Sequence, residues 1–354
     1  MSKFISEKLS ALEAYVPGEQ PQDRQYVKLN TNECPFPPSP YATRLARQAA
    51  GNLNLYCDPE CGTLAAVASE VFGVAKEKMI FTNGSDEVLN FAFLAFCDEK
   101  TPAVFPDVTY GFYPVFARVN GVPYREIPLT KEYCVDPKDY FGAKGTIFLA
   151  NPNAPTGVSL GRDEIESIVK ANPENVVVVD EAYVDFGGES ALPLIEKYDN
   201  LLVTRTFSKS RSLAGGRLGI GFACKELIAD LRKIKYSTNP YNVNSMTAAA
   251  GVGALLDEEY FEKNVALLKE NRAVLTAALS ERGFAVLPSS ANFIFAKSAD
   301  FSGETLYKKL KEKGVLVRYF DRDRLKEFVR ISIGTKAELE VLIKKIEEIA
   351  EEAK

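Results

Sequence analysis

Seven short apolar runs, separated by segments of helix length, are the feature that most limits how this sequence can fold. Several runs, such as TIFLA at 146–150 and NVVVVD at 175–180, do not alternate with polar residues. Strands of this kind are typically buried on both faces, as in a parallel sheet covered by helices. We therefore predict a large α/β domain built on a seven-stranded, mostly parallel sheet. The runs are 79–82, 103–106, 124–129, 146–150, 175–180, 200–205 and 217–223.

The pattern changes after Pro240, where helical spacing predicts one long helix over about 244–282 that ends near Gly283. Two strands, FAVL and NFIFA, follow it. The helix ETLYKKLKEKG comes next, then the single strands VLVRY and FVRISI and a final amphipathic helix. These elements predict a smaller α+β domain. We divide the chain into an N-terminal arm (1–40), a large cofactor-binding domain (41–245) and a small C-terminal domain (246–354).

Composition excludes several classes of protein and of catalytic site. The 43 basic and 48 acidic residues leave a net charge of −5, without the basic excess typical of nucleic-acid binding. The chain has no histidine, which removes histidine nucleophile pairs, general bases and metal ligands. No uncharged stretch is typical of a membrane span, and the cysteine spacing matches neither a disulfide framework nor a zinc site. We expect a cytoplasmic protein with no bound metal.

Polar residues follow several of the predicted strands, where parallel sheets usually bind ligands. The first strand leads into Asn83-Gly84-Ser85-Asp86-Glu87, where Ser85 or Asp86 can cap a helix or its free N–H groups can bind an anion. The fifth strand ends at Asp180, with Tyr183 close behind, and the sixth runs into Thr206-Phe207-Ser208-Lys209, with Arg217 beyond. Their convergence on one sheet edge indicates a catalytic site.

At these positions the sequence resembles the fold type I pyridoxal-phosphate enzymes, the aspartate aminotransferase superfamily, over nearly the whole chain. The resemblance implies pyridoxal 5'-phosphate as cofactor, with Lys209 as its Schiff-base lysine and proton shuttle. Asp180 then pairs with the pyridine nitrogen and Tyr183 with the ring oxygen. Asn153 is assigned to the same ring oxygen, because Ala154 stands where the superfamily commonly has asparagine. The other implied cofactor contacts are Gly84, Ser85, Asp86, Tyr110, Thr206, Ser208 and Arg217.

Within that superfamily, the N-terminal segment and PYNVN at 240–244 resemble the histidinol-phosphate aminotransferases. This resemblance implies amine transfer between histidinol phosphate and 2-oxoglutarate, in histidine biosynthesis. The implied substrate-binding residues are Tyr15, Asn32, Arg318 and Arg330, the two arginines acting on the substrates' anionic groups. It also implies a homodimer in which Tyr56 reaches the cofactor phosphate of the partner subunit.

Three alternatives remain open from the sequence. Threonine-phosphate decarboxylase is a related activity that also acts on a phosphorylated small molecule. An aromatic or general amino-acid aminotransferase would use the same cofactor residues. A non-catalytic regulator of the same fold would bind nucleic acid through an additional region, which the sequence does not show. We expect the partners to be a small-molecule amino donor and a 2-oxo acid, without nucleic acid or membrane.

Overall fold

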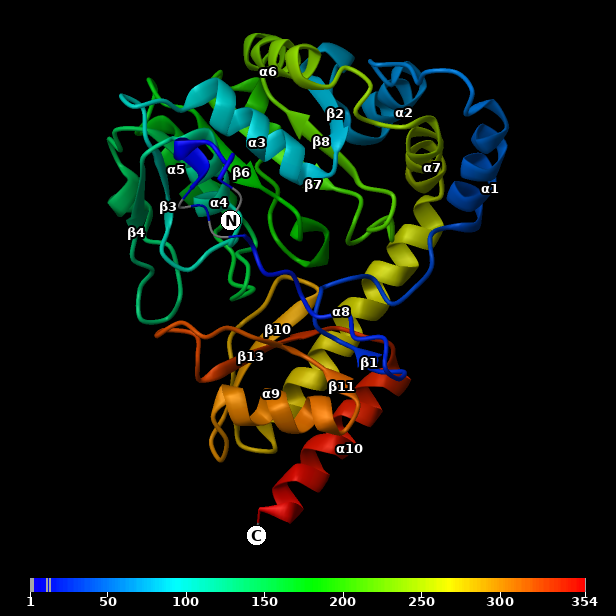
Figure 1. Ribbon diagram of the computed structural model, residues 1–354, viewed down its shortest axis with the longest axis vertical. Helices are drawn as coiled ribbons and strands as arrows, with labels where there is room; N and C mark the ends of the chain where they lie inside the picture. The colour runs from blue at the N-terminus through cyan, green and yellow to red at the C-terminus, as the bar shows by residue number, and fades with distance from the viewer. Residues whose placement is uncertain (1–2, 11, 13, 354) are drawn as a thin grey trace.

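The computed structural model describes residues 3–10, 12 and 14–353 of the chain. Residues 1, 2, 11 and 13 of the predicted N-terminal arm and residue 354 of the predicted small domain therefore lie outside the described residues. Figure 1 shows two lobes, with the large sheet in the upper lobe and the chain from residue 284 to the C-terminal helix in the lower one.

The upper lobe is built on a seven-stranded sheet of order β2-β8-β7-β6-β5-β3-β4. β8 is antiparallel to both of its neighbours, whereas the other four pairings are parallel. The predicted seven-stranded, mostly parallel sheet is therefore confirmed. Its strands are β2 (Met79–Asn83), β3 (Ala103–Pro106), β4 (Tyr124–Ile127), β5 (Thr146–Ala150), β6 (Val177–Asp180), β7 (Leu201–Thr206) and β8 (Leu218–Phe222).

Helices cover both faces of this sheet, which explains why its strands are apolar without alternation. Val177 and Val179 of β6 belong to one hydrophobic core, and Val178 belongs to a second core on the other face. The first core receives side chains from α1 (Pro40–Ala49), α2 (Gly62–Phe72), α5 (Arg162–Lys170) and α7 (Ser245–Leu256). The second receives them from α3 (Ser85–Phe96), α4 (Tyr113–Asn120) and α6 (Lys225–Thr238).

The long helix predicted over 244–282 is wrong, because the structure divides it into α7 and α8 (Glu258–Ser280). Asp257 separates them with ψ of 64°, which is not helical, and its two flanking helices pack differently. α7 lies against α1 in the upper lobe, while α8 runs into the lower lobe (Figure 1). Gly283 lies beyond the last turn with a φ of +77°, a conformation that favours glycine.

The lower lobe contains an antiparallel sheet of order β12-β13-β10-β9. The prediction of one strand at VLVRY is wrong, because Val317 separates two strands with different partners. β11 pairs in parallel with β1 (Val27–Lys28) of the N-terminal arm, and β12 pairs with β13. The elements are β9 (Phe284–Val286), β10 (Phe293–Ser298), α9 (Gly303–Glu312), β11 (Val315–Leu316), β12 (Arg318–Tyr319), β13 (Phe328–Ser332) and α10 (Lys336–Glu352).

The division at residue 245 between a large and a small domain stays a prediction. Ala250 and Ala254 of α7 pack in a core of the upper lobe, whereas Val265 and Leu268 of α8 pack in the lower lobe. We therefore propose that the small domain begins with α8. Across residues 3–10, 12 and 14–353, no helix combines the length and the apolar character needed to cross a membrane.

Candidate active site

Asp180 lies at the carboxyl end of β6, in register with Ala150 of β5 and Thr204 of β7. Its carboxylate is buried and accepts hydrogen bonds from Thr204 Oγ1 at 3.1 Å and from Tyr113 OH at 3.5 Å. Sequence analysis missed both donors. A signal was present, since Tyr113 follows Tyr110 by about one helical turn and Thr204 precedes Thr206 by one strand period.

The surroundings of Asp180 favour a cationic partner. Burial raises the pKa of its carboxyl group to about 7, and the nearby carboxylate of Asp86 acts in the same direction. The hydrogen bond from Thr204 opposes this effect only in part. A buried carboxyl group in such a place is stabilised by a proton or by a ligand cation, such as a protonated ring nitrogen.

Gly84 forms the turn between β2 and α3, and the predicted capping by Ser85 or Asp86 is wrong. Gly84 itself is the N-cap residue, with a φ of +78°, and no side chain caps the helix. Ser85 and Asp86 instead occupy the first turn of α3, where backbone N–H groups lack intrahelical acceptors. A Cβ on Gly84 would lie 2.5 Å from Nη2 of Arg217, so only glycine leaves this turn open. The turn is therefore shaped for an anion.

A cavity of about 140 Å³ lies between this turn and the ends of β6 and β7. At its anion-binding end, Arg217 forms an ion pair with Asp86 (3.1 Å) and donates to Ser208 Oγ at 3.5 Å. Nine of the predicted cofactor residues line the cavity: Ser85, Asp86, Tyr110, Asp180, Tyr183, Thr206, Ser208, Lys209 and Arg217. The structure thus brings together groups from the ends of β2, β3, β6 and β7, which are far apart in sequence.

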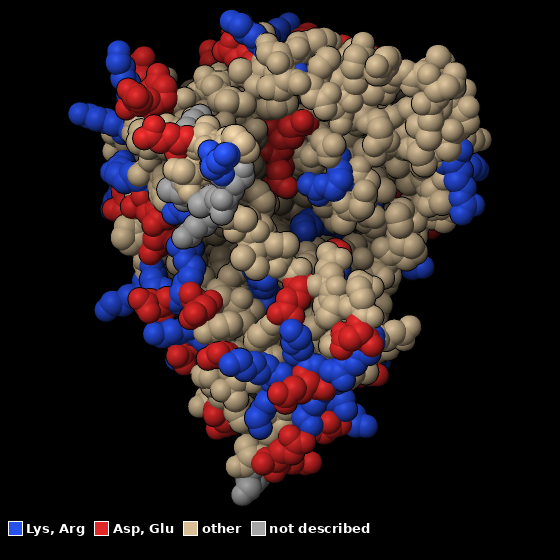
Figure 2. Space-filling model, viewed as in Figure 1, with Lys and Arg blue, Asp and Glu red and all other residues tan. Residues whose placement is uncertain are grey.

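Lys209 lies where this cavity meets a larger one of about 830 Å³, and it lines both. Its Nζ donates to the carbonyl oxygen of Thr31 at 3.4 Å and lies 5.7 Å from the ring centre of Tyr183. The hydroxyl of Tyr183 accepts a hydrogen bond from Asn32 Nδ2 at 3.1 Å. The lysine amine is thus placed between the two compartments. Figure 2 shows the hollow where the lobes meet.

All four predicted substrate-binding residues line the larger cavity: Tyr15, Asn32, Arg318 and Arg330. Arg318 of β12 lies directly opposite Arg330 of β13 in the sheet register. Arg318 donates to the carbonyl oxygens of Val16 and Pro17, and Arg330 Nη2 donates to Asn30 O at 3.1 Å. The Nε of Arg330 is buried and has no hydrogen-bond partner within the described part of the chain.

This pairing of two arginines indicates a site for an anion. Like charges directly opposite each other on a sheet destabilise it, and both burial and the charge of Arg318 lower the pKa of Arg330. Sequence analysis missed other residues of the same cavity, including Glu19, Tyr307 and Arg322. Glu19 accepts a hydrogen bond from Tyr307 and forms an ion pair with Lys311 of α9. These contacts depend on how the arm folds back, which no local pattern reveals.

Two predicted site residues lie away from the cavities of their own chain. The amide of Asn153 is held by Thr109 Oγ1, Val108 O and Thr156 Oγ1, each at 3.0 Å, and Ala154 lines the cavities in its place. Its predicted contact with the ring oxygen therefore lacks geometric support. Tyr56 is 84% exposed and stacks on Tyr241, with ring centres 4.6 Å apart.

The smaller cavity fits pyridoxal phosphate by its donor set. The turn at Gly84 and Arg217 offer donors to a phosphate, Asp180 offers a carboxylate to the ring nitrogen, and Lys209 offers an amine at the opening. Tyr110, whose hydroxyl donates to Asp86 at 2.7 Å, places an aromatic ring at the cavity wall. This fold and this site together define a fold type I pyridoxal-phosphate enzyme.

Comparison with known proteins agrees with this class. Residues 24–346 match the family model "Aminotransferase class I and II". The chain is 44% identical over 351 residues to the histidinol-phosphate aminotransferase of Brachyspira hyodysenteriae, covering 99% of both chains. It is 45% identical to histidinol-phosphate aminotransferase 1 of Pseudomonas fluorescens, covering 97% of this chain and 98% of that one. The chain belongs to the class I and II aminotransferases, and it is a pyridoxal-phosphate-dependent enzyme.

Solved structures show the same fold. The histidinol-phosphate aminotransferase of Sinorhizobium meliloti, determined in complex with pyridoxal-5'-phosphate, superposes with a TM-score of 0.89 at 22% identity, covering 100% of this chain and 99% of that one. The aspartate aminotransferase of Thermus thermophilus, determined with maleate, gives a TM-score of 0.79 at 20% identity, with 91% of each chain covered. At this level of identity the superpositions establish the fold.

The raised pKa of Asp180 predicts how the stability of the apoprotein depends on pH. Folded Asp180 binds its proton more tightly than the unfolded chain, where the pKa is about 3.8. Its contribution to the free energy of unfolding is therefore complete below pH 4 and is lost as the pH rises towards 7. We expect Asp180→Asn to flatten this decline in chemical denaturation between pH 4 and 7.

The chain is well suited to this measurement because it has no histidine, the side chain that normally titrates near neutral pH. Burial also raises the pKa of neighbouring Glu181, so part of the decline should remain in Asp180→Asn and disappear when Glu181→Gln is added. If Asp180→Asn retained the pH dependence of the wild type, the carboxyl group of Asp180 would not carry it.

Proposed function

We propose that the protein transfers an amine from histidinol phosphate to 2-oxoglutarate, in histidine biosynthesis, with pyridoxal phosphate as cofactor. The observation that carries this proposal is the cross-strand pair Arg318 and Arg330 beside Lys209 in the larger cavity. Two guanidinium groups on one wall suit substrates with a phosphate or with two carboxylates. The relatives from Brachyspira hyodysenteriae and Pseudomonas fluorescens, at 44% and 45% identity, are named histidinol-phosphate aminotransferases. The expected cytoplasmic location remains part of this proposal.

Residues of the smaller cavity have separate roles in the proposed amine transfer. The chemistry that pyridoxal phosphate supplies when bound is withdrawal of electrons from the substrate carbon that bears the amine. Asp180 would hold the ring nitrogen in its protonated state, with Thr204 and Tyr113 fixing the carboxylate. Tyr183, oriented by Asn32, would donate to the ring oxygen. Lys209 would accept the proton from the substrate carbon that bears the amine and would donate it to the neighbouring carbon of the cofactor, C4′.

The same cavity must accept two different amines in turn. Glutamate carries a carboxylate on the reacting carbon, and the buried Nε of Arg330 is a free donor for it. Histidinol phosphate has a phosphate group instead, which Arg318 and Arg330 can share. Tyr15, whose ring packs 4.3 Å from that of Phe112, forms an apolar part of the wall for a flat imidazole ring.

A spectroscopic screen tests this assignment against the alternatives. The protein in its pyridoxal form is mixed with histidinol phosphate, threonine phosphate or phenylalanine, and conversion to the pyridoxamine form is followed by absorbance. We expect histidinol phosphate to give the highest second-order rate constant for this conversion. Faster conversion by phenylalanine, or release of CO₂ from threonine phosphate, would replace the proposed substrate. Absence of cofactor absorbance would favour a non-catalytic protein.

We further propose that the protein is a homodimer with shared active sites. Tyr56 stacks on Tyr241 at the surface, and Leu53 and Leu55 beside it are 55% and 65% exposed. Such a group of exposed apolar side chains supports a protein interface, and a two-fold dimer is the commonest soluble assembly. In this arrangement Tyr56 would complete the anion-binding end of the partner subunit's cavity.

Mixing two impaired variants tests the shared site. A dimer of one Lys209→Ala chain and one Tyr56→Ala chain contains one site with both native residues. Activity should therefore rise above either parent and approach roughly one quarter of the wild-type value at random mixing, because half of the dimers are mixed and each has one intact site.

The matched control mixes Lys209→Ala with Asp180→Ala. Both residues line the same cavity of one chain, so every site in a mixed dimer remains impaired. Failure of the Tyr56 mixture to recover activity, with subunit exchange demonstrated by mass, would show that Tyr56 does not serve the partner subunit.

A further inference from the structure

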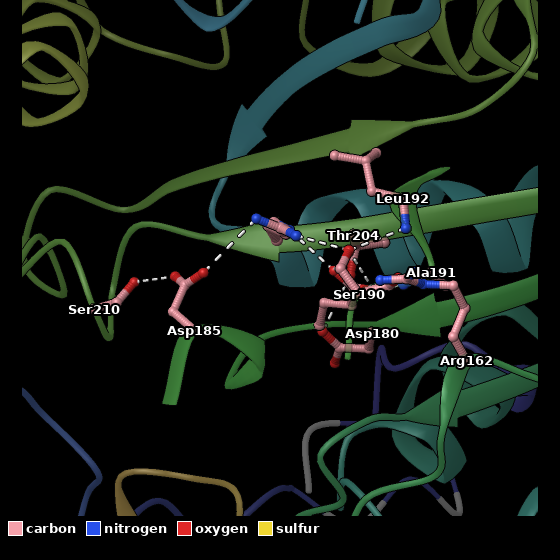
Figure 3. A network of polar contacts seen from close by, with 10 residues as sticks. Arg162, Asp180, Asp185, Ser190, Ala191, Leu192, Thr204 and Ser210 are labelled. Atoms are coloured by element: carbon pink, nitrogen blue, oxygen red, sulfur yellow. Dashed lines mark hydrogen bonds and ion pairs between the residues drawn. The ribbon is translucent and has the colours of Figure 1, made fainter. Parts of the chain in front are cut away.

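A polar network, buried at Glu181 and Ser210 and partly exposed between them, connects the residues that follow Asp180 and Lys209 in the sequence. We call it the β6–β7 network, and Figure 3 shows it beside Asp180. None of its described members lines either cavity, so it does not contact a ligand there directly. Its members are Glu181, Asp185, Ser190, Arg205 and Ser210.

The network begins at Glu181, the neighbour of Asp180. The side chain of Glu181 is 0% exposed. Its carboxylate accepts hydrogen bonds from Ser190 Oγ at 2.8 Å, from the backbone N–H of Ala191 at 2.5 Å and from Arg205 Nε at 3.0 Å. A buried carboxylate with three donors is held in one orientation, because any other would leave the charge without partners.

Arg205 connects Glu181, next to β6, with Asp185, which contacts the segment that contains Lys209. Its Nη2 donates to Ser190 Oγ at 2.8 Å, and its Nη1 lies 3.7 Å from Oδ1 of Asp185. The other oxygen of Asp185 accepts a hydrogen bond of 2.5 Å from the hydroxyl of Ser210. Ser210 is buried and directly follows Lys209. A continuous series of polar contacts therefore links the two residues next to Asp180 and Lys209.

The segment around Lys209 has little regular structure to hold it. Residues 207–217 connect β7 to β8 as turns and bends, outside any helix or strand. The backbone bonds near Lys209 include Ser212 N to Lys209 O at 3.2 Å and Leu213 N to Phe207 O at 2.9 Å. The side-chain bond from Ser210 to Asp185 attaches this segment to the short helix after β6.

We propose that Arg205, Asp185 and Ser210 are positioning residues that hold Lys209 in a fixed place relative to Asp180. The inference rests on the proposed roles of these two residues. A proton-transfer group must lie within hydrogen-bond reach of its target, and displacement by about 1 Å lowers the rate by about a factor of 100. The network can prevent such a displacement because it joins the neighbours of both groups. Glu181 at one end adjoins Asp180, and Ser210 at the other end adjoins Lys209.

Ser210→Ala tests this inference with a minimal change, since it removes one hydroxyl and leaves the ion pairs in place. We expect kcat for the glutamate half-reaction to fall by about 10-fold with KM changed less than 2-fold, because binding groups are untouched. In the apoprotein, amide hydrogen exchange should accelerate in residues 206–213. This second measurement requires neither cofactor nor substrate, so it separates failure of this inference from failure of the proposed function.

A stability control separates positioning from a general loss of folding energy. The Ser302 hydroxyl caps α9 by accepting from Thr305 N at 3.2 Å, and it donates to Thr305 Oγ1 at 2.9 Å, so Ser302→Ala likewise removes one hydrogen-bonded serine hydroxyl. We expect it to leave kcat and the exchange of residues 206–213 unchanged. Asp185→Asn, which keeps an oxygen acceptor for Ser210, should lower kcat less than Asp185→Ala does. Wild-type kcat and exchange in Ser210→Ala, or equal effects of Ser210→Ala and Ser302→Ala, would overturn the proposal.

Discussion

Replacing Lys209 with alanine is expected to lower kcat by a factor on the order of 10⁴ or more, because one change removes both the cofactor attachment point and the proton-transfer group. Lys209 lines both cavities, and within the described residues its Nζ makes one hydrogen bond, to Thr31 O at 3.4 Å. The fold should persist, since this single long bond stabilises little. Turnover and the melting temperature of the apoprotein check the two expectations.

A covalent-labelling experiment checks the identity of the attachment point independently of turnover. Borohydride reduction of the wild-type enzyme with its cofactor, followed by proteolysis and mass spectrometry, should find the label on Lys209. Lys78, whose Nζ pairs with Glu196 at 2.6 Å, is a control position outside both cavities. Labelling elsewhere, together with wild-type turnover in Lys209→Ala, would remove the assignment.

The second large effect is expected at Arg330. Removing the charged partner of a bound, desolvated anion costs about 2 to 5 kcal/mol. Arg330→Ala should therefore raise KM for glutamate by at least roughly 30-fold, since 1.4 kcal/mol corresponds to a factor of ten. Steady-state kinetics with glutamate and with histidinol phosphate measure this change.

Two variants serve as controls for this prediction. Arg330→Lys keeps the charge but loses the planar pair of donors, so its KM should be intermediate. Arg318→Ala should impair histidinol phosphate more than glutamate, because the free buried donor, Nε, belongs to Arg330. Small and equal effects of both alanine variants on the two substrates would show that these arginines do not bind the substrates' anionic groups.

The sequence predicted the sheet well because burial on both faces leaves a clear pattern. Residues 176–179 are all valine, and Val178 and Val179 belong to cores on opposite faces. The breaks at Asp257 and Val317 were not predictable in the same way. Each separates elements that are locally similar, and only the different packing partners of α7 and α8, or of β11 and β12, reveal the division.

Convergence of the candidate site followed from topology, because the carboxyl ends of parallel strands meet at one edge. Asp180, Lys209 and Arg217 could therefore be grouped before the structure was known. The direction of a side chain could not be predicted in this way. The amide of Asn153 bonds to Thr156 and to Thr109, which lies 44 residues away in the sequence. The opposition of Arg318 and Arg330 depends likewise on strand register, which their separate motifs do not contain.

Transfer of an isotopic label follows the amine itself from donor to product. The purified protein with pyridoxal phosphate is incubated with histidinol phosphate carrying ¹⁵N in its amino group and with unlabelled 2-oxoglutarate. We expect ¹⁵N-labelled glutamate in an amount equal to the histidinol phosphate consumed, and none with Lys209→Ala. Suppose that glutamate stays unlabelled with ¹⁵N-histidinol phosphate, while another ¹⁵N-labelled amine gives labelled glutamate under the same conditions. This result would contradict histidinol phosphate as the substrate.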